Sequence, residues 1–175
     1  MRYKIAAMAL VASLSLAPTL AKAADFTAQL SGFEEVGELN NESGAIMTAG
    51  EATLLLTIDQ KSQRIQYQLV FGNTSSAVTQ AHIHFGRERQ PGGPIAFLCS
   101  SLGNGPAGTP RCPATGGTVA GTISIAQLLG IPGQNVPPNS FDALAAMLLS
   151  HSAYVNIHTM RFPSGELRGQ IVPAS

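Results

Sequence analysis

The chain has 175 residues, with ten Lys and Arg against ten Asp and Glu, and 45% of its residues are hydrophobic. This length is typical of one domain with a substantial core. The chain has no excess of basic charge, no tryptophan and an aromatic share of 6%. It therefore lacks the basic surface and the stacking platform of nucleic-acid-binding proteins, and we expect no nucleic-acid partner.

Residues 1–23 have the pattern of a secretory signal peptide. Arg2 and Lys4 precede an apolar run over residues 5–16, and small residues follow at the expected cleavage site. The run is shorter than the ~20 residues that a spanning helix needs, and no later stretch is apolar enough, so we expect no membrane span. The pattern predicts an exported protein, periplasmic or secreted. Its mature part, residues 24–175, carries seven basic side chains against ten acidic ones.

Alternation of apolar and polar residues dominates the mature chain and predicts about eight strands. Within one of them, Ile65, Tyr67 and Leu69 share a face while polar side chains occupy the other. We expect strands at residues 26–31, 53–58, 64–69, 79–85, 95–98, 118–125, 154–160 and 166–172. Short strands separated by turn residues predict an all-β fold, a Greek-key sandwich or barrel.

One short helix interrupts the strands. Apolar residues at positions 141, 144, 145, 148 and 149 have the spacing of a buried helical stripe, and a pair of prolines precedes them. Asn139 or Ser140 is expected to cap the helix. His151, just past its end, is expected to interact with the helix dipole. We find no internal repeat and no linker, so we expect a single domain.

Cys99 and Cys112 are the two cysteines of the chain. In an exported protein they are expected to form a disulfide. It would close a loop rich in Gly, Pro and Ser and stabilise the fold by about 3 kcal/mol in the entropy model. The alternative is a pair of thiolate metal ligands, but no second cysteine pair and no nearby histidine would complete such a site.

Three of the four histidines lie on two predicted strands in the same context. In the segment Ala-His-Ile-His-Phe-Gly of residues 81–86, alternation places the apolar side chains inward and His82 and His84 on the opposite face. In the later strand, it likewise places Asn156 and His158 outward. If the two strands are neighbours, three imidazole nitrogens reach one metal ion at ~2 Å.

The last strand adds a cation and a carboxylate to this face. A hairpin loop over residues 161–165 would pair His158 with Arg168. Together with Asn156, Arg168 and Glu166 are then candidates to support the histidines or to attract an anion. Alternatively, Arg168 pairs with Glu166.

These segments resemble the CHRD family, a module named after the animal protein chordin and common in exported bacterial proteins. The matching pieces are Ala-His-Ile-His-x-Gly at 81–86, Tyr-Val-Asn-Ile-His-Thr at 154–159 and Pro-x-Gly-Glu-Leu-Arg-Gly-Gln-Ile at 163–171. The resemblance spans about residues 26–172, so we expect residues 24–175 to form one CHRD domain. It implies a β-barrel or sandwich and no defined biochemical role.

A fainter likeness is to the copper/zinc superoxide dismutases. By motif, His82 and His84 are similar to their first two copper ligands, His158 to the last, and Arg168 to the arginine that draws superoxide in. The loop that carries the bridging histidine and the zinc ligands in that family, here residues 87–117, contains no histidine and holds both cysteines. The likeness therefore implies a superoxide-dismutase-like fold and a copper site without a zinc subsite.

The sequence leaves two functions open. The first is a mononuclear transition-metal site, for which copper is favoured by the imidazole ligands and by its place in the divalent affinity order. Its occupancy should fall as the pH drops through ~6.5, because each histidine must be neutral to bind. A redox enzyme that acts on superoxide is a narrower variant of this hypothesis.

The second function is a structural or protein-binding module without metal, in which the histidines hydrogen-bond to the backbone. The sequence names no protein partner for it. Other enzyme classes lack support, since there is no G-x-S-x-G elbow. The adjacent Glu34 and Glu35 are expected to be solvated loop residues rather than an acid/base pair.

Overall fold

The computed structural model describes residues 25–36 and 44–174 of the chain. The predicted signal peptide lies outside these residues. Within the described part, no helix has the length and apolar character needed to cross a membrane.

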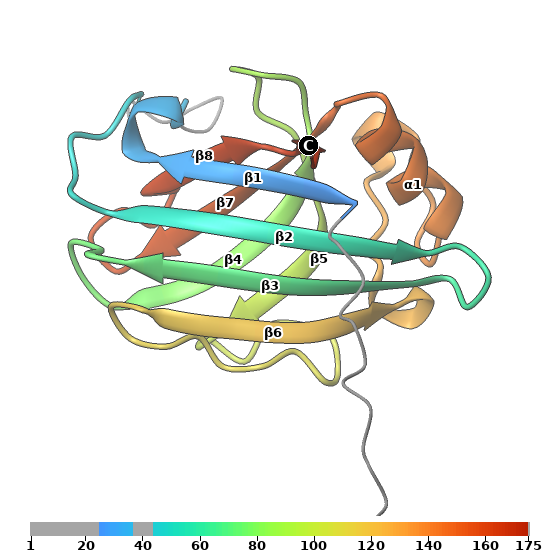
Figure 1. Ribbon diagram of the computed structural model, residues 1–175, viewed down its shortest axis with the longest axis horizontal. Helices are drawn as coiled ribbons and strands as arrows, with labels where there is room; N and C mark the ends of the chain where they lie inside the picture. The colour runs from blue at the N-terminus through green and yellow to red at the C-terminus, as the bar shows by residue number, and fades with distance from the viewer. Residues whose placement is uncertain (1–24, 37–43, 175) are drawn as a thin grey trace, which may run out of the picture.

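Nine strands of the described residues form one antiparallel sheet that curls into a nearly closed barrel. They are β1 (Phe26–Ser31), β2 (Glu51–Asp59), β3 (Arg64–Gly72), β4 (Val78–Phe85), β5 (Pro94–Ser100), β6 (Gly117–Ser124), β7 (Ala153–Thr159), β8 (Leu167–Gln170) and β9 (Val172–Pro173). Their order is β5-β4-β7-β8-β1-β2-β3-β6, with β9 paired to β1. In Figure 1, β1, β2, β3 and β6 form the near wall, and the other long strands form the far wall. The expected all-β architecture is confirmed.

The apolar face of each strand lines the barrel interior. Ile65, Tyr67 and Leu69 of β3 are buried, as are Val155 and Ile157 of β7. These are the positions that alternation assigned to the core. Burial of the apolar face therefore sets the direction of every side chain on the opposite, outer face.

The expected strand at residues 166–172 is interrupted in the structure. Its first part, β8, lies between β7 and β1 and pairs with both, β9 pairs with β1, and Ile171 separates the two. Ile171 donates its amide hydrogen to the carbonyl of Ala153 and is fully buried. The pairing with β1 is thus broken at Ile171 and resumes after it, which alternation alone does not reveal.

The seam of the barrel lies between β5 and β6, the two ends of the strand order. Tyr67 of β3 reaches this seam from inside, and its hydroxyl donates to the carbonyl of Leu98 in β5 over 2.6 Å. A Cβ at Gly121 of β6 would stand 2.8 Å from the Tyr67 hydroxyl oxygen, so glycine leaves the space that the ring needs. Burial raises the pKa of Tyr67 to about 12, and the hydroxyl keeps its proton as the donor.

Helix α1 (Phe141–Leu149) lies at one end of the barrel (Figure 1). The Ser140 side chain accepts a hydrogen bond from the amide of Ala143, as expected of an N-cap. The buried stripe differs from the expectation at its end, because Met147 is buried while Leu149 is 65% exposed. His151 follows the helix in the left-handed region at φ 54° and is exposed.

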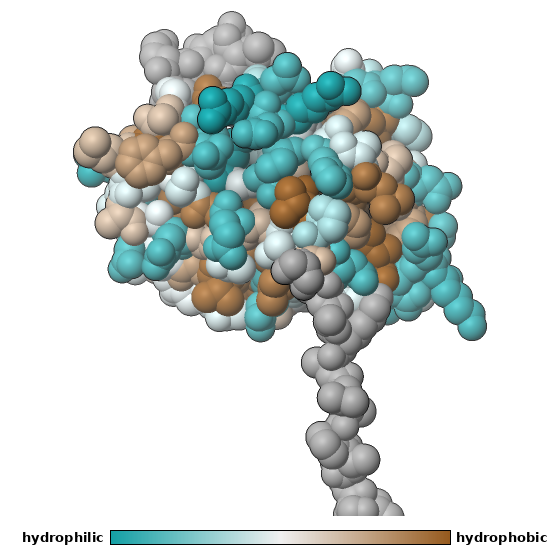
Figure 2. All heavy atoms as spheres, turned by 45° about the horizontal axis from the view of Figure 1, so that its top comes forward, coloured by the Kyte–Doolittle hydropathy of each residue, from teal (hydrophilic) through white to brown (hydrophobic). Residues whose placement is uncertain are grey.

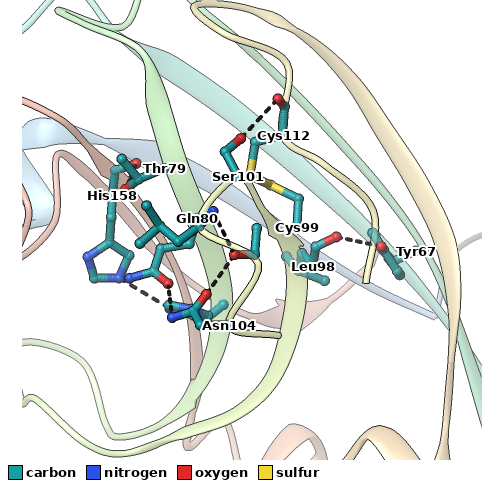
Figure 3. The surroundings of a disulfide bond; sticks show 12 residues. Tyr67, Thr79, Gln80, Leu98, Cys99, Ser101, Asn104, Cys112 and His158 are labelled. Carbon is teal, nitrogen blue, oxygen red and sulfur yellow. Dashed lines mark hydrogen bonds between the residues drawn. A yellow bond between two sulfur atoms is a disulfide. The ribbon is translucent and has the colours of Figure 1, made fainter. Parts of the chain in front are cut away.

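Cys99 and Cys112 form the expected disulfide, with Cα atoms 5.1 Å apart. The bond joins the end of β5 to the segment before β6. Figure 3 shows Asn104, from the enclosed loop, donating to the side-chain oxygen of Gln80 on β4. Ser100 in turn donates to Asn104. These contacts fix the loop against the strand that carries two of the histidines.

Candidate metal site

The outer face of β4, β7 and β8 carries polar side chains in aligned rows. The pairing register places His82 opposite Asn156, and Asn156 opposite Arg168. In the next row, His84 lies opposite Tyr154. The rings of His84 and Tyr154 stack with centroids 4.8 Å apart. The pairing of β4 with β7 therefore brings together residues that are at least 70 positions apart in the chain.

The expected surface site is in fact covered. His82, His84 and His158 are 5%, 9% and 5% exposed, although they face away from the barrel interior. All seven residues of β7 are buried, so this strand is covered on both faces. Antiparallel sheets commonly leave one face to water. Here that face forms a second, polar interior.

The three imidazoles converge on one region. One nitrogen from each of His82, His84 and His158 lies within 4.8 Å of the others. In the closest pair, Nδ1 of His82 is 3.2 Å from Nε2 of His158. The Phe97 ring of β5 packs edge-on against His82, with centroids 4.3 Å apart. The strands β4 and β7 are neighbours, and their three imidazoles converge as the sequence analysis expected.

Main-chain carbonyls hold two of the rings. Nδ1 of His84 lies 2.9 Å from the carbonyl oxygen of Gly92, and Nδ1 of His158 lies 2.8 Å from that of Pro163. A carbonyl oxygen only accepts, so each Nδ1 carries the proton and each Nε2 presents its lone pair. Nε2 of His158 is then the acceptor from Nδ1 of His82.

Two nitrogens of the cluster lack partners. Nε2 of His82 and Nε2 of His84 are buried and have no hydrogen-bond partner among the described residues. Burial, and then the neighbouring His158 and His84, lower the pKa of His82 to about 2. Burial also lowers the pKa of His84 to about 4, against the opposing effect of the Gly92 carbonyl. Both rings are therefore neutral near pH 7, with lone pairs available.

Comparison with known proteins places these segments in one family. The sequence matches the family described as CHRD domain over residues 26–171, which is most of the chain. The chain belongs to the CHRD family. Searches of curated proteins and of solved structures returned no match. The CHRD domain and its intramolecular disulfide indicate an extracellular protein.

The sequence analysis expected Arg168 of the CHRD domain to lie opposite His158, and this expectation is wrong. Arg168 pairs with Asn156, two residues away from the expected register. The reason is that the connection between β7 and β8, residues 160–166, is not the symmetric hairpin loop that was expected. The pairing next to it joins Ile157 to Leu167, which shifts the register by two positions.

The guanidinium of Arg168 holds a loop instead of facing solvent. Its Nη2 donates to the carbonyls of Arg87 and Gln90 over 3.0 and 2.9 Å. Its Cζ lies 3.4 Å from the centre of the Tyr154 ring, and the side chain is 2% exposed. The loop of residues 87–90 is exposed and projects at the top of Figure 1, the end that comes forward as a hydrophilic area in Figure 2. Arg168 fastens this loop to the sheet beneath it.

Glu166 binds loop groups and not Arg168. Its carboxylate accepts hydrogen bonds from the hydroxyl of Thr48, the amide and hydroxyl of Ser75, and the hydroxyl of Thr159. Burial alone would raise the pKa of Glu166, but these hydrogen bonds outweigh it and lower the pKa. Glu166 therefore anchors three segments of the chain.

Glu35 is a site residue that the sequence analysis missed. Glu34 is exposed as expected, whereas Glu35 is 4% exposed and accepts hydrogen bonds from the Asn156 side-chain amide and the Val36 backbone amide. Gly165 permits this contact, because a Cβ there would stand 2.3 Å from a Glu35 oxygen and φ is +134°. Nothing in the sequence around Glu35 distinguishes it from Glu34.

A cavity of about 550 Å³ opens beside the histidines. His84 and His158 line it, and His82 does not. The remaining polar lining includes Glu35 and Asn156, and none of the described residues of the lining is a lysine or an arginine. The apolar part of the wall comes from Pro91, Pro94, Ile131 and Tyr154.

Proposed function

We propose that this CHRD-domain protein binds one transition-metal ion through His82, His84 and His158, and that copper is the metal it takes. The observation that carries the proposal is the convergence of one nitrogen from each of the three rings within 4.8 Å, where Nε2 of His84 is buried and has no partner among the described residues. A buried nitrogen without a partner costs about 1–3 kcal/mol, and a metal ion at the cluster would offset this cost.

The hydrogen bonds around the cluster support ligation. Histidines that bind metals usually donate the second ring N–H to a carbonyl or carboxylate, which fixes the tautomer and the ring orientation. The carbonyls of Gly92 and Pro163 occupy that position for His84 and His158. The ligand atoms would be Nε2 of these two rings and one nitrogen of His82.

The separations in the cluster also suit one ion. Two nitrogens bound to the same ion at ~2.0–2.1 Å stand roughly 3 Å apart at ordinary bond angles. Nδ1 of His82 lies 3.2 Å from Nε2 of His158, so this is the His82 nitrogen we assign to the ion. Without metal this nitrogen donates to His158, so binding requires His82 to carry its proton on Nε2 instead.

Copper is the choice among metals because the donors are three neutral imidazoles. Such donors suit copper, zinc and nickel, and copper binds most tightly among the divalent ions. Three protein ligands leave a coordination position open for a small molecule. We assign metal binding and not superoxide dismutation, since the guanidinium of Arg168 is buried and held by loop carbonyls instead of facing the open side of the cluster.

The test is titration of chelator-treated protein with Cu(II), followed by calorimetry and electron paramagnetic resonance. We expect one ion per chain and nitrogen hyperfine structure from the imidazoles. His84→Ala and His158→Ala should each weaken binding about 100-fold or more, because each removes a ligand. His151→Ala is the matched control, since His151 is exposed beyond the helix.

If the two cluster variants bind copper as tightly as the wild type, the metal proposal is wrong. The protein would then be a structural or protein-binding module whose histidines serve the backbone. Zn(II) titration in parallel shows whether the site prefers copper, and tighter zinc binding would contradict the metal assignment alone.

A further inference from the structure

Arg168, Tyr154 and His84 form a stack that ends at the histidine cluster. The Cζ atom of Arg168 lies 3.4 Å from the centre of the Tyr154 ring. The same ring stacks on His84 with an interplanar angle of 14° and centroids 4.8 Å apart. Tyr154 belongs to β7, which lies between β8, the strand of Arg168, and β4, the strand of His84. The guanidinium and the imidazole therefore contact opposite faces of the phenol ring.

The positive charge of Arg168 is buried. The side chain is 2% exposed, and its Nη2 donates to the carbonyls of Arg87 and Gln90. Among the described residues, no carboxylate forms an ion pair with this guanidinium. A guanidinium keeps its proton at any ordinary pH, and salt screens a buried charge much less than an exposed one. Arg168 therefore supplies a permanent positive charge inside the polar interior.

This charge reaches a proposed metal ligand. Arg168 acts electrostatically on both Tyr154 and His84, whereas the carboxylate of Glu35 acts on Tyr154. A cation over the face of an aromatic ring is also attracted by the ring itself. Tyr154 thus holds the guanidinium at a fixed place beside the ligand set. Arg168 cannot bind the ion, because a guanidinium has no lone pair to offer.

The oxidation state of copper decides how strongly a fixed charge acts on the ion. Cu(II) carries two positive charges and Cu(I) carries one, and neutral imidazoles offset neither of them. A buried cation beside the site therefore disfavours the divalent ion more than the monovalent ion. At a separation of roughly 10 Å and an effective dielectric constant of ~20, Coulomb's law makes the extra unit of charge about tenfold less favourable.

We propose that Arg168 determines the oxidation-state preference of the copper site and shifts it toward Cu(I). The inference rests on the proposed function, because it concerns the ion that His82, His84 and His158 bind. It adds a residue outside the ligand set that selects the form of the metal. The stack with Tyr154 is the contact that places this residue.

The test measures the affinities of the protein for Cu(II) and for Cu(I) separately. Cu(II) is titrated in air, and Cu(I) is titrated under nitrogen with ascorbate, in competition with the Cu(I) chelator bicinchoninate. Arg168→Met keeps much of the length of the side chain and removes its charge. It should favour Cu(II) over Cu(I) about tenfold more than the wild type does. This change corresponds to a fall of about 59 mV in the one-electron reduction potential.

Three further variants separate the charge of Arg168 from its structural role. Arg168→Lys keeps the charge but loses the planar fork that holds the loop carbonyls, so the ratio of the two affinities should stay near that of the wild type. Arg168→Gln is neutral and keeps an NH₂ donor for a loop carbonyl. It should reproduce the shift of Arg168→Met, and it replaces that variant if the methionine protein does not fold. Arg89→Met is the matched control, since the Arg89 side chain is 76% exposed and water screens its charge.

A neutral variant of Arg168 with the wild-type ratio of affinities would overturn the proposal and leave copper binding intact. Equal shifts in Arg168→Met and Arg168→Lys would also overturn it, because they would trace the effect to the loop and not to the charge. A wild-type protein that binds copper in neither oxidation state would refute the proposed function, and this inference with it. The two failures are therefore distinguishable. Glu35 is unchanged in every protein compared, so its charge does not affect the comparison.

Discussion

Each histidine that a main-chain carbonyl holds has its two ring nitrogens in different environments. In His84 and His158, Nδ1 faces a carbonyl oxygen and Nε2 faces the cluster. The sequence predicts which faces the rings occupy, but not these carbonyl contacts, because every residue has a carbonyl. The same limit explains why Glu35 was missed, since its burial depends on a close approach by Gly165.

The lowered pKa values predict how the metal-free protein responds to acid. In the unfolded chain, His82 and His84 bind protons below about pH 6.5. In the folded protein, burial lowers the pKa of His84 to about 4 and that of His82 to about 2. The unfolded state therefore binds more protons in this window, and stability falls as the pH drops from 6.5 toward 4. At pH 5 the loss should be on the order of 2 kcal/mol for each of the two residues.

Urea unfolding of chelator-treated protein at pH 7 and pH 5 measures this loss. Carboxyl groups are still largely ionised at pH 5. Glu166, whose pKa is lowered, therefore contributes little to the difference in stability between the two pH values. The same lowered values move proton competition for the metal below the ~6.5 that an ordinary histidine implies, as far as His82 and His84 are concerned. Equal stability at the two pH values would show that the rings are not buried as neutral groups.

At the scale of single elements, alternation predicts the strands well because each buries one apolar face. It locates β3, β4 and β7 to within three residues and assigns their faces correctly. It does not give the register between β7 and β8. That register depends on the conformation of an irregular, asymmetric connection, after which Ile157 pairs with Leu167 and Arg168 lies opposite Asn156 instead of His158.

Tyr67 offers a test of the barrel seam. Tyr67→Phe removes the hydrogen bond to the Leu98 carbonyl and leaves that carbonyl buried without this donor. We expect a loss of about 1–3 kcal/mol in the free energy of unfolding, measured by urea denaturation. Amide hydrogen exchange in β5 should also accelerate more than in β2, which lies away from the seam. A loss below about 0.5 kcal/mol would mean that the seam is held by packing alone.

At the scale of the whole molecule, the domain has two interiors of different character. The inner one is apolar and follows from the sequence pattern. The outer one, over β4, β7 and β8, is polar and exists because irregular loops cover it. A period-two pattern cannot predict which outer faces are covered, since loops carry no such period. The sequence pattern therefore predicts the correct face for the three histidines, but it does not predict that they are buried.

The disulfide should contribute to the stability of the whole fold. Replacing both cysteines, Cys99→Ser with Cys112→Ser, opens a link across a sequence separation of 13 and should cost about 3 kcal/mol in the chain-entropy picture. Urea denaturation measures the cost. Reductant should lower the stability of the wild type by a similar amount and leave the double variant unchanged. If the double variant loses less than about 1 kcal/mol, the contacts of Asn104 with Gln80 suffice to fix the loop.

One buried carboxylate joins distant parts of this molecule. Thr48, Ser75 and Thr159 belong to three separate stretches of the chain, and all of them donate to Glu166. If one of these stretches detached from the barrel, the buried carboxylate of Glu166 would lose part of its hydrogen bonds while the other stretches still enclosed it. That end of the barrel should consequently open as a cooperative unit, all three stretches together, and not by fraying one loop at a time.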